Sequence, residues 1–419
     1  MMALGDKVQR LRVWRGITQT ELADGLVTPS MISQIEGNKA NPSTELLLNI
    51  IQRLGVSVET FLKDVELELE GRALYRFALE LVEYRQYGVA LKLFRELENT
   101  PDFPKTIEFS YEMAICLQNT GKTQEAIDLL DRVLTQAQVS ADKPFLAKVL
   151  YQMAEAYFQL DNINLARFYA EKADAAVSGV PDYNELQAKV KGILGKAASA
   201  ASLHEQALSF HETAYRLLIP DSPVEAADSL LHTAIEHTHL GQYQHAGQTF
   251  DMLFDLYKKL PSNSDQLRAK FHYARLLRLI HREAEAHELF RECLNEFQSP
   301  TLRKWVPLIY GEMSQLEIER GQWEESKFFQ RKALDSAGHS GSMLANLHQM
   351  FGESYYQKGR CEDAIEHFEK SISLYETDGF YEQVIQILPK LSNCYDQMGN
   401  IEQALSTLER TKGYMETIL

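Results

Sequence analysis

The chain has 419 residues, of which 45% are hydrophobic and 24% are charged, and its formal net charge is −16. Such a length predicts about two or three domains, and the composition is typical of a globular protein with a large core. No apolar run approaches the roughly 20 residues that span a bilayer, and residues 1–20 lack the apolar core of a signal peptide. These features exclude the membrane-spanning and secreted classes and predict a cytoplasmic protein.

The first recognisable motif is a pair of short helices joined by a tight turn. Thr18 and Glu21 have the spacing of a capping box, in which a hydroxyl and a carboxylate satisfy backbone N–H groups where a helix begins. Thr28 followed by Pro29 predicts an N-cap and a proline in the first helical position, so a second helix continues over Ser30 to Glu36. Small and amide side chains on the exposed face of that helix suit the reading of base edges in a major groove.

Three more short helices are expected around this pair. One precedes it over residues 4–15, and two follow within residues 44–62, the first of them capped by Ser43. The expected packing positions are Val8, Leu11 and Trp14 in the first helix, Leu22, Ala23 and Leu26 in the second, and Met31, Ile32 and Ile35 in the third. Five helices are therefore predicted within residues 1–65.

This segment resembles the Cro/C1-type helix-turn-helix domain of phage repressors and many bacterial regulators. The resemblance is carried by the TQ-x-ELA opening, the S-x-I-E turn into GN-K, and the closing LGVS-x-x-x-FL. It implies that residues 1–65 bind double-stranded DNA through Gln19, Thr28, Pro29, Ser30, Ser33 and Gln34, with Arg10, Arg15 and Lys39 as phosphate partners. Relatives often carry a base-reading polar residue at the position of Pro29, so contact there is expected to be apolar or absent.

The distribution of charge predicts that the protein is a homo-oligomer. Residues 1–65 hold seven Lys or Arg and seven Asp or Glu, so all of the net negative charge lies beyond residue 65. Because binding to the phosphate backbone needs positive charge, a neutral DNA-binding domain binds weakly as one copy. Two copies on a shared site bind better, since the effective concentration of the second is high. At least a dimer is expected, and a tetramer is the alternative.

An acidic segment follows the first domain. Asp64 to Arg72 contains neither proline nor serine and carries alternate apolar residues, which predicts a helical or extended connector. The expected organisation is a DNA-binding domain over residues 1–65, a linker over residues 66–72, and a repeat domain over residues 73–419.

From Arg72 onward the chain repeats itself every 36 to 41 residues. A small residue lets two helices approach closely, and a glycine before it supplies the turn between them. The small residues are Ala90, Ala126, Ala166, Ala207, Ala246, Ala286, Ser326, Ala364 and Ala404, and the turn glycines are Gly121, Gly241, Gly321, Gly359 and Gly399. Neighbouring units must bury each other's apolar faces, so the pattern predicts nine helix pairs in a right-handed solenoid whose first helices line a concave groove.

The unit from Leu347 to Leu374 resembles the tetratricopeptide consensus. The matching residues are Phe351, Gly352, Tyr355, Gly359, Ala364 and Phe368. The predicted fold class is therefore all-α, with a five-helix Cro/C1-type domain followed by a right-handed α-solenoid of about nine tetratricopeptide-like helix pairs.

The combination of the two domains is similar to the peptide-sensing regulators of Gram-positive bacteria, the Rap/Rgg/NprR/PlcR-type family. The layout is nearest to the NprR type, and an AimR-like layout is the alternative. This resemblance implies a cytoplasmic, homo-oligomeric quorum-sensing transcriptional regulator, controlled by a short signalling peptide in the groove. A Rap-like alternative, or second activity, is the docking of a response regulator, which is inhibited or dephosphorylated, through the surface from Tyr75 to Asn119.

Several polar residues are candidates for contact with a peptide. Residues eleven positions before each small residue are expected on the inner face, and Asn, Gln and Arg there suit a peptide backbone or a carboxylate. The predicted peptide-binding residues are Lys196, Arg268, Arg275, Arg278, Gln315, Glu353 and Asn393, with Glu155 and Ile235 at equivalent points and Lys148 and Lys189 nearby. The alternative is that these residues are solvated and form internal ion pairs.

Other motifs indicate no chemistry. Gly121-Lys122-Thr123 lacks the earlier glycine and the strand of a phosphate-binding loop, and four histidines between His232 and His245 lack the spacing of a helical metal site. The cysteines Cys116, Cys293, Cys361 and Cys394 form no C-x-x-C pair, so buried free thiols are expected. A non-enzymatic protein without a metal or cofactor is predicted.

Overall fold

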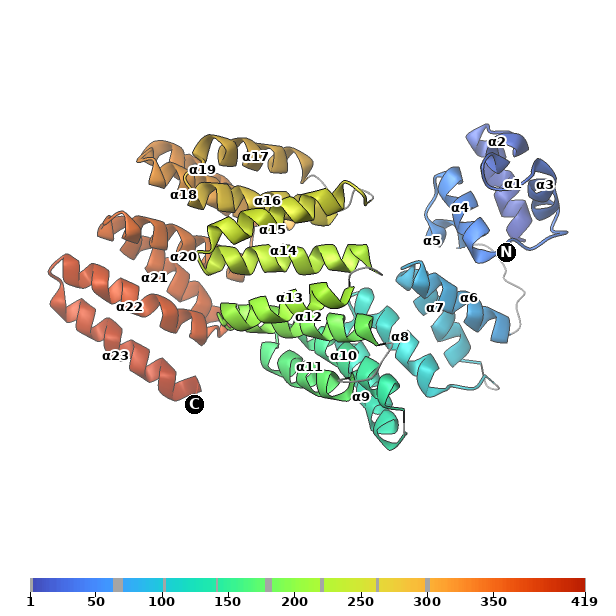
Figure 1. Cartoon of the computed structure of the whole chain (residues 1–419), viewed down its shortest axis with the longest axis horizontal. Coiled ribbons are helices and arrows are strands. Elements are labelled where there is room, and N and C mark those ends of the chain that lie inside the picture. The colour runs from blue at the N-terminus through green and yellow to red at the C-terminus, as the bar shows by residue number, and fades with distance from the viewer. Residues whose placement is uncertain are drawn as a thin grey trace. The chain divides into compact units, whose positions relative to one another are not determined.

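The computed structural model describes residues 3–62, 71–100, 103–140, 142–177, 183–218, 222–260, 264–297 and 302–418. These residues form α-helices and one short 3-10 helix, and none of them lies in a β-strand (Figure 1). The chain divides into two compact units, Met1–Leu218 and Ile219–Leu419. No helix among the described residues is long and apolar enough to cross a membrane. The predicted all-α fold class is confirmed.

The first five helices of unit 1 form a small bundle, here called the head. They are α1 (Leu4–Arg15), α2 (Gln19–Ala23), α3 (Pro29–Glu36), α4 (Thr44–Leu54) and α5 (Val58–Leu62). The capping box between Thr18 and Glu21 begins α2, Thr28 caps α3 ahead of Pro29, and Ser43 caps α4. The buried core includes Val8, Leu22, Ile32, Ile35, Ile50 and Phe61. The predicted caps and the five-helix arrangement are thus confirmed.

Two of the predicted packing positions in the head are wrong. Trp14 was expected in the core but is 75% exposed, and Met31 is 39% exposed. Trp14 lies six residues after Val8, which at 3.6 residues per turn places it roughly 120° around the helix axis from that core residue. The inward position on α1 is instead taken by Arg12, which is only partly exposed.

Eighteen helices follow among the described residues, in nine consecutive pairs. In unit 1 they are α6 (Gly71–Glu83), α7 (Tyr87–Glu98), α8 (Ile107–Asn119), α9 (Thr123–Val139), α10 (Lys143–Gln159), α11 (Ile163–Val177), α12 (Asn184–Ala200) and α13 (His204–Leu218). In unit 2 they are α14 (Pro223–His239), α15 (Tyr243–Tyr257), α16 (Ser264–Leu279), α17 (Glu283–Glu296), α18 (Val306–Glu319), α19 (Trp323–Ala337), α20 (Gly341–Gln357), α21 (Cys361–Asp378), α22 (Tyr381–Gln397) and α23 (Ile401–Ile418), with a 3-10 turn over Arg303–Trp305. The predicted number of helix pairs is confirmed.

The small residue of each pair is buried, as the repeat pattern predicted. Of the nine positions, eight have no exposed surface, and Ala404 in the last pair is 6% exposed. Close approach is also visible at Gly352 on α20, where an added Cβ would lie 2.6 Å from the ring of Phe368. Any side chain there would force α20 and α21 apart, which explains the glycine.

Each of the nine turns within a pair contains one residue in the left-handed backbone region. Five of these residues are the predicted glycines, with φ between 70 and 80°. The other four carry side chains and are Arg85, Asp161, Ser202 and His281. Glycine adopts this conformation without steric cost, so the sequence signal was clear only where glycine was used.

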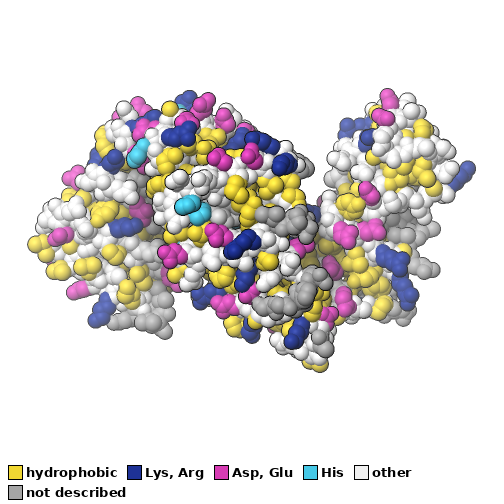
Figure 2. Space-filling view, in the orientation of Figure 1, with side chains coloured by type: hydrophobic (Ala, Val, Ile, Leu, Met, Phe, Trp, Pro, Cys, Tyr) yellow, Lys and Arg dark blue, Asp and Glu magenta, His cyan; other side chains and the backbone are white. Residues whose placement is uncertain are grey.

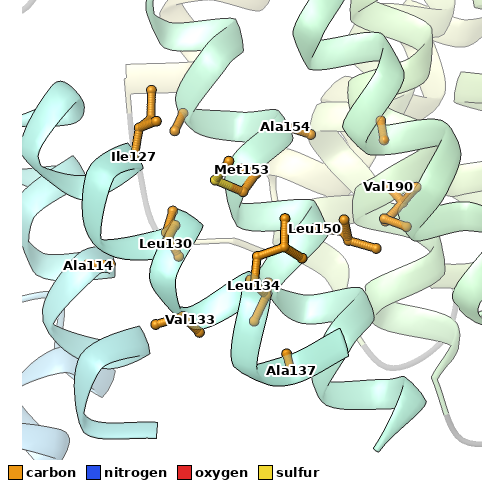
Figure 3. Close-up of a cluster of buried hydrophobic side chains, with 14 of the residues drawn as sticks. Ala114, Ile127, Leu130, Val133, Leu134, Ala137, Leu150, Met153, Ala154 and Val190 are labelled. Carbon is orange, nitrogen blue, oxygen red and sulfur yellow. The ribbon is translucent and has the colours of Figure 1, made fainter. Parts of the chain in front are cut away.

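The helix pairs of unit 1 share a continuous core. Figure 3 shows buried apolar side chains from α8, α9, α10 and α12 meeting in one cluster, among them Ala114, Leu130, Leu150 and Val190. No helix pair could bury these side chains alone, because the apolar face of each pair is covered by side chains of the neighbouring pairs.

The linker lies largely outside the described residues. Residues 63–70 hold most of the segment predicted as linker, and α6 begins at Gly71, so Gly71 and Arg72 belong to the first turn of a helix. The domain boundaries at residues 65 and 73 stay predictions.

The four cysteines are buried and free, as predicted. Burial raises the pKa of Cys116, Cys293 and Cys394 to about 12. These thiols are therefore protonated at neutral pH and behave as small apolar side chains.

Candidate functional sites

Most of the predicted DNA-reading residues are exposed on or beside α3. Thr28 Oγ1 accepts a hydrogen bond from the backbone N–H of Met31 at 3.3 Å, which fixes the start of α3. Beyond this cap the exposed residues around α3 are Thr28, Pro29, Ser30, Met31, Ser33, Gln34 and Lys39. All six predicted residues from Thr28 to Lys39 are exposed, on α3 or in the segments that flank it. Met31 joins them, which sequence reasoning missed because it was assigned to the core.

A buried ion pair holds α1, α2 and α3 together behind this surface. Arg12 Nε lies 2.5 Å from Glu36 Oε1, and Arg12 Nη2 donates to Glu36 Oε2 at 2.9 Å. Gln19 Nε2 also donates to Glu36 Oε2, at 2.7 Å. Burial alone would raise the pKa of Glu36, but the hydrogen bonds from Arg12 and Gln19 outweigh it and hold that pKa below its ordinary value. Glu36 is therefore charged at neutral pH and fixes the angle between the helices.

Gln19 accordingly makes a structural contact that the sequence did not predict. Its side chain is partly buried, and its amide nitrogen is already engaged with Glu36. The contact holds the Gln19 amide beside the N-terminus of α2, where backbone N–H groups attract anions. Its role at a phosphate stays a prediction.

The three predicted phosphate partners differ in the contacts that they make within the head. Arg10 and Lys39 are exposed. Arg15 is also exposed, but its Nη2 donates to the carbonyl of Gly55 at 2.8 Å and ties the end of α1 to the end of α4. A Cβ at Gly55 would lie 1.9 Å from that nitrogen, so this glycine leaves room for the guanidinium. Contact of Arg15 with phosphate would compete with this tie.

The head packs directly on the first helix pair of the repeats. Leu48 of α4 and Val58 and Leu62 of α5 contact the apolar cluster of α6 and α7, and Phe77 of α6 contacts the core of the head. Lys92 Nζ of α7 lies 2.5 Å from a carboxylate oxygen of Glu59 in α5. The predicted DNA-reading surface on α3 takes no part in these contacts and stays open.

Three of the predicted ligand residues, Arg268, Arg275 and Arg278, form a basic cluster on α16 in unit 2, and this cluster is largely engaged in ion pairs. Arg275 Nε lies 2.7 Å from Glu312 Oε1, and Arg278 Nη2 lies 3.0 Å from Glu312 Oε2. Arg278 also pairs with Glu319 and is only 7% exposed. Burial would raise the pKa of Glu312, but the two guanidinium groups outweigh it and hold that pKa below its ordinary value. For Arg278, the structure favours the alternative of an internal ion pair.

Arg268, the third arginine of the predicted basic cluster, lies on the same helix as the other two and is partly exposed. Its Nη1 donates to Asp265 at 3.0 Å and lies 3.9 Å from Asp228 of α14. Its guanidinium carbon lies 5.8 Å from the centre of the Trp305 ring. Acidic and aromatic neighbours therefore surround this cation.

His272 lies one helical turn after Arg268 on α16, between the arginines of the cluster. Burial, and then the positive charges of Arg275 and Arg268, lower the pKa of His272 well below its ordinary value. This imidazole is therefore neutral at physiological pH and adds no positive charge to the cluster.

The remaining predicted ligand residues also contact neighbouring groups. Gln315 Nε2 donates to the carbonyl of Met350 at 3.3 Å, and Asn393 Oδ1 accepts from Gln397 at 2.7 Å. Glu353 accepts from Gln349 at 3.2 Å and pairs with Lys390. In unit 1, the charge of Lys196 acts on Glu155, one helix pair earlier.

Helices α8 and α10 in unit 1 carry carboxylates that are less well compensated. Burial raises the pKa of Glu112, and the opposing charge of Lys148 does not offset it. Burial likewise raises the pKa of Glu155 despite Lys196 and Lys189. Sequence reasoning placed Glu155 on the inner face but gave no signal for the state of its charge.

A hollow in unit 2 lies away from the predicted ligand residues. It has a volume of about 600 Å³ and is lined by Arg291, Leu294, Asn295, Phe297, Arg303, Val306, Tyr310 and Ser336. None of the seven predicted ligand residues lines it. Among the described residues there is no group of three or more His, Cys, Asp or Glu side chains placed to hold a metal ion.

Comparisons with known proteins agree with both parts of the chain. A helix-turn-helix family model matches residues 8–61, and a tetratricopeptide repeat model matches residues 106–176 and 342–412. No curated protein sequence matches the chain.

Two solved structures are similar in fold. One is the apo form of the quorum sensor NprR from B. thuringiensis, which is 13% identical and has a TM-score of 0.60 over 86% of this chain and 100% of that one. The other is a Rap protein complexed with Competence and Sporulation Factor, which is 13% identical and has a TM-score of 0.59 over 83% of this chain and 98% of that one. The chain thus contains a helix-turn-helix segment over residues 8–61 and tetratricopeptide repeats over residues 106–176 and 342–412, and its fold is like those of NprR and Rap.

Proposed function

We propose that this protein is a cytoplasmic, non-enzymatic transcriptional regulator. It binds operator DNA through α3 and is controlled by a short signalling peptide on the inner faces of the first helices of the repeats. The observation that carries the proposal is the exposed surface of Ser30, Ser33 and Gln34, held in place by the buried contact between Arg12 and Glu36. Exposed hydroxyl and amide groups on a rigid short helix are suited to base edges in the major groove.

Peptide control is supported by the inner polar surface and by likeness of fold. Amide and charged groups recur in several helix pairs at positions predicted to face inward, including Lys196, Gln315 and Asn393, and such groups bond a peptide backbone or its termini. NprR is described as a quorum sensor, and it shares this fold. The proposed regulator acts as a homo-oligomer, because a head without net charge gains affinity from a second copy on the same operator.

A selection of bound sequences from a random duplex library tests DNA binding by the full-length protein. We expect one enriched motif with two half-sites, roughly 34 Å or a multiple of it apart. Enrichment of no motif, with binding that depends only on salt, would contradict specific DNA recognition. The matched control is Ser33→Ala with Gln34→Ala, which should fold normally and lose the motif.

Peptide control is tested separately with the short-peptide fraction of the host's culture medium. We expect that fraction to change the thermal midpoint of the protein and its affinity for the enriched operator. Asn393→Ala should retain DNA binding and weaken the response to peptide. A protein that binds the operator and responds to no peptide fraction would remove peptide control while leaving the DNA-binding proposal in place.

The alternative is the docking of a response regulator on the surface from Tyr75 to Asn119. Part of that surface is already covered, since Phe77 and Lys92 contact the head. Docking of a response regulator would therefore require the head to leave this surface. Deletion of residues 1–65 should then increase regulator binding. If the variant without residues 1–65 still does not bind a response regulator, the alternative is contradicted.

A further inference from the structure

The last helix, α23, carries two stripes of residues on different sides. One stripe packs on the preceding helix through Ala404 and Tyr414, which contact the C-terminal apolar cluster. The second stripe is apolar and open to solvent, although it lies on a helix of a folded repeat. It consists of Ile401, Leu405, Leu408 and Met415, which are 62%, 58%, 48% and 50% exposed.

The open stripe has the spacing of a helix-packing seam. Its residues lie at positions 401, 405, 408, 412 and 415, in steps of four and three, and Lys412 occupies the fourth position. This is the spacing by which one side of a helix stays in register with a second helix. Scattered surface apolar residues need no partner, but a regular stripe of them indicates one.

In the preceding helix pair, the equivalent face of α21 is covered. Forty residues earlier in the chain, the equivalent positions on α21 are Cys361, Ile365, Phe368, Ile372 and Tyr375. Four of these are buried and Ile365 is partly buried, and all five belong to the cluster that includes Leu388 and Leu391 of α22. On α21 this face is covered by α20 and α22 together, since Phe368 and Tyr375 also contact α20. The stripe on α23 is thus a face that the fold covers in the preceding pair. Figure 2 shows hydrophobic side chains at the surface in the region that Figure 1 labels α23.

We propose that a second copy of this chain covers the stripe, with the two α23 helices antiparallel about a two-fold axis beside Leu408. In this register Leu408 meets Leu408 of the second copy, and Ile401 meets Met415 in two symmetric places. Such an isologous contact is closed, so it yields a dimer and no further growth. The inference rests on the homo-oligomer proposed above and assigns it a surface.

Charge favours the antiparallel arrangement. Neither Glu402 nor Lys412 forms an ion pair with another described residue, whereas Arg410 is occupied by Glu376 of its own chain at 2.7 Å. In the antiparallel register Lys412 lies over Leu405 and reaches Glu402 of the second copy, once on each side of the axis. A parallel pairing would place Lys412 against Lys412, which like charges oppose.

The first test is the oligomeric state of the full-length protein by light scattering after size exclusion, over a wide range of concentration. We expect wild type to be a dimer, and Leu405→Glu with Leu408→Glu to weaken dimerisation by roughly a hundredfold or more. Both leucines are exposed, so circular dichroism should show the wild-type helix content in the variant. The control is Met252→Glu on α15, an equally exposed apolar residue outside the stripe, which should remain dimeric.

Other outcomes overturn the inference in distinguishable ways. A double variant that remains a dimer would place the interface elsewhere and leave the proposed homo-oligomer intact. A wild-type protein that is monomeric at every concentration and on its operator would contradict the homo-oligomer itself. Mass that grows without limit would contradict the two-fold arrangement.

The second test addresses the register. Glu402→Lys and Lys412→Glu should each weaken dimerisation several-fold, because each places like charges together across the axis. The double exchange should restore wild-type dimerisation, since opposite charges again face each other. A double variant as weak as the single variants would overturn the antiparallel register.

Discussion

Three carboxylates on the first helices of the repeats, Glu312 in unit 2 and Glu112 and Glu155 in unit 1, differ in how well nearby positive charge compensates their burial. In unit 2, Glu312 is buried between Arg275 and Arg278, and its pKa is held below the ordinary value. In unit 1, burial raises the pKa of Glu112 and Glu155, because the nearby lysines do not offset the loss of solvent. Glutamates at similar positions in the sequence repeats thus differ in whether a neighbouring positive charge compensates their carboxylates. Arg275 and Arg278 are engaged in ion pairs within the fold, whereas the nearby lysines leave the burial of Glu112 and Glu155 uncompensated.

The largest effect is expected from removing the shared carboxylate of unit 2. Glu312→Gln leaves the buried guanidinium of Arg278 with only Glu319, and breaking a buried pair typically costs about 3–5 kcal/mol. Denaturant unfolding at pH 7 measures this loss as a lower midpoint. A change below about 1 kcal/mol would show that the ion pairs of unit 2 contribute little, and the contrast between the units would fail.

The same substitution sharpens the comparison through pH. Glu312 has a folded-state pKa below its unfolded value, so its contribution is present above the unfolded pKa and is lost as pH falls through the folded pKa. The stability difference between wild type and Glu312→Gln should therefore shrink as pH falls below the ordinary carboxyl value of 4.5. Unfolding midpoints across the acid range check this, and a difference that does not change with pH would contradict it.

The head offers a test of base reading with an intermediate effect. Gln34→Ala should cost about 1–3 kcal/mol at one base step and relax the sequence preference there. Competition binding with single-base operator variants measures this. Met31→Ala on the same surface is the matched control, since its apolar side chain has no hydrogen bond to lose. An unchanged preference profile would remove Gln34 from the base-reading residues.

In unit 1 the matched substitution should act in the opposite direction. Glu155 has a folded-state pKa above its unfolded value, so stability falls as pH rises from the ordinary carboxyl value through the raised one. Glu155→Gln removes this penalty and should stabilise the protein by no more than about 1 kcal/mol at pH 7, with no gain at about pH 4. Destabilisation at pH 7 comparable with that of Glu312→Gln would show that the two units do not differ.

The smallest effect is expected at the contact between the head and α7. Lys92→Glu removes an exposed ion pair with Glu59, and such pairs contribute about 0–1 kcal/mol. Phe77→Ala, which removes the apolar part of the same contact, should loosen the head more. Hydrogen exchange of α4 and α5 measures how far the head is released from α6 and α7. If both variants keep the protection of the wild type, the contact does not hold the head.

Much of the fold could be predicted from the sequence because its signals are local. The capping box at Thr18, the cap and proline at Thr28 and Pro29, and the glycine turns each act over a few residues, and all are confirmed. The nine small residues were recognisable because close helix approach excludes large side chains at a fixed spacing.

The site was less predictable, because burial and charge pairing depend on residues far apart in the chain. Arg278 looked like a ligand contact at its position on the helix, but Glu312 and Glu319 on another helix occupy it. Trp14 was assigned to the core from its spacing after Val8 and Leu11, but it lies on the exposed side of α1.

The sequence by itself thus determined the helices, their caps and turns, and the two-part organisation of the chain, since these follow from propensity and periodicity. The tertiary structure alone decided which charges are compensated, that Arg12 and Glu36 fix α3, and that the open stripe of α23 corresponds to a face that is covered in the preceding pair. The reason is physical: a side chain's charge state and exposure are set by groups that only folding brings near it.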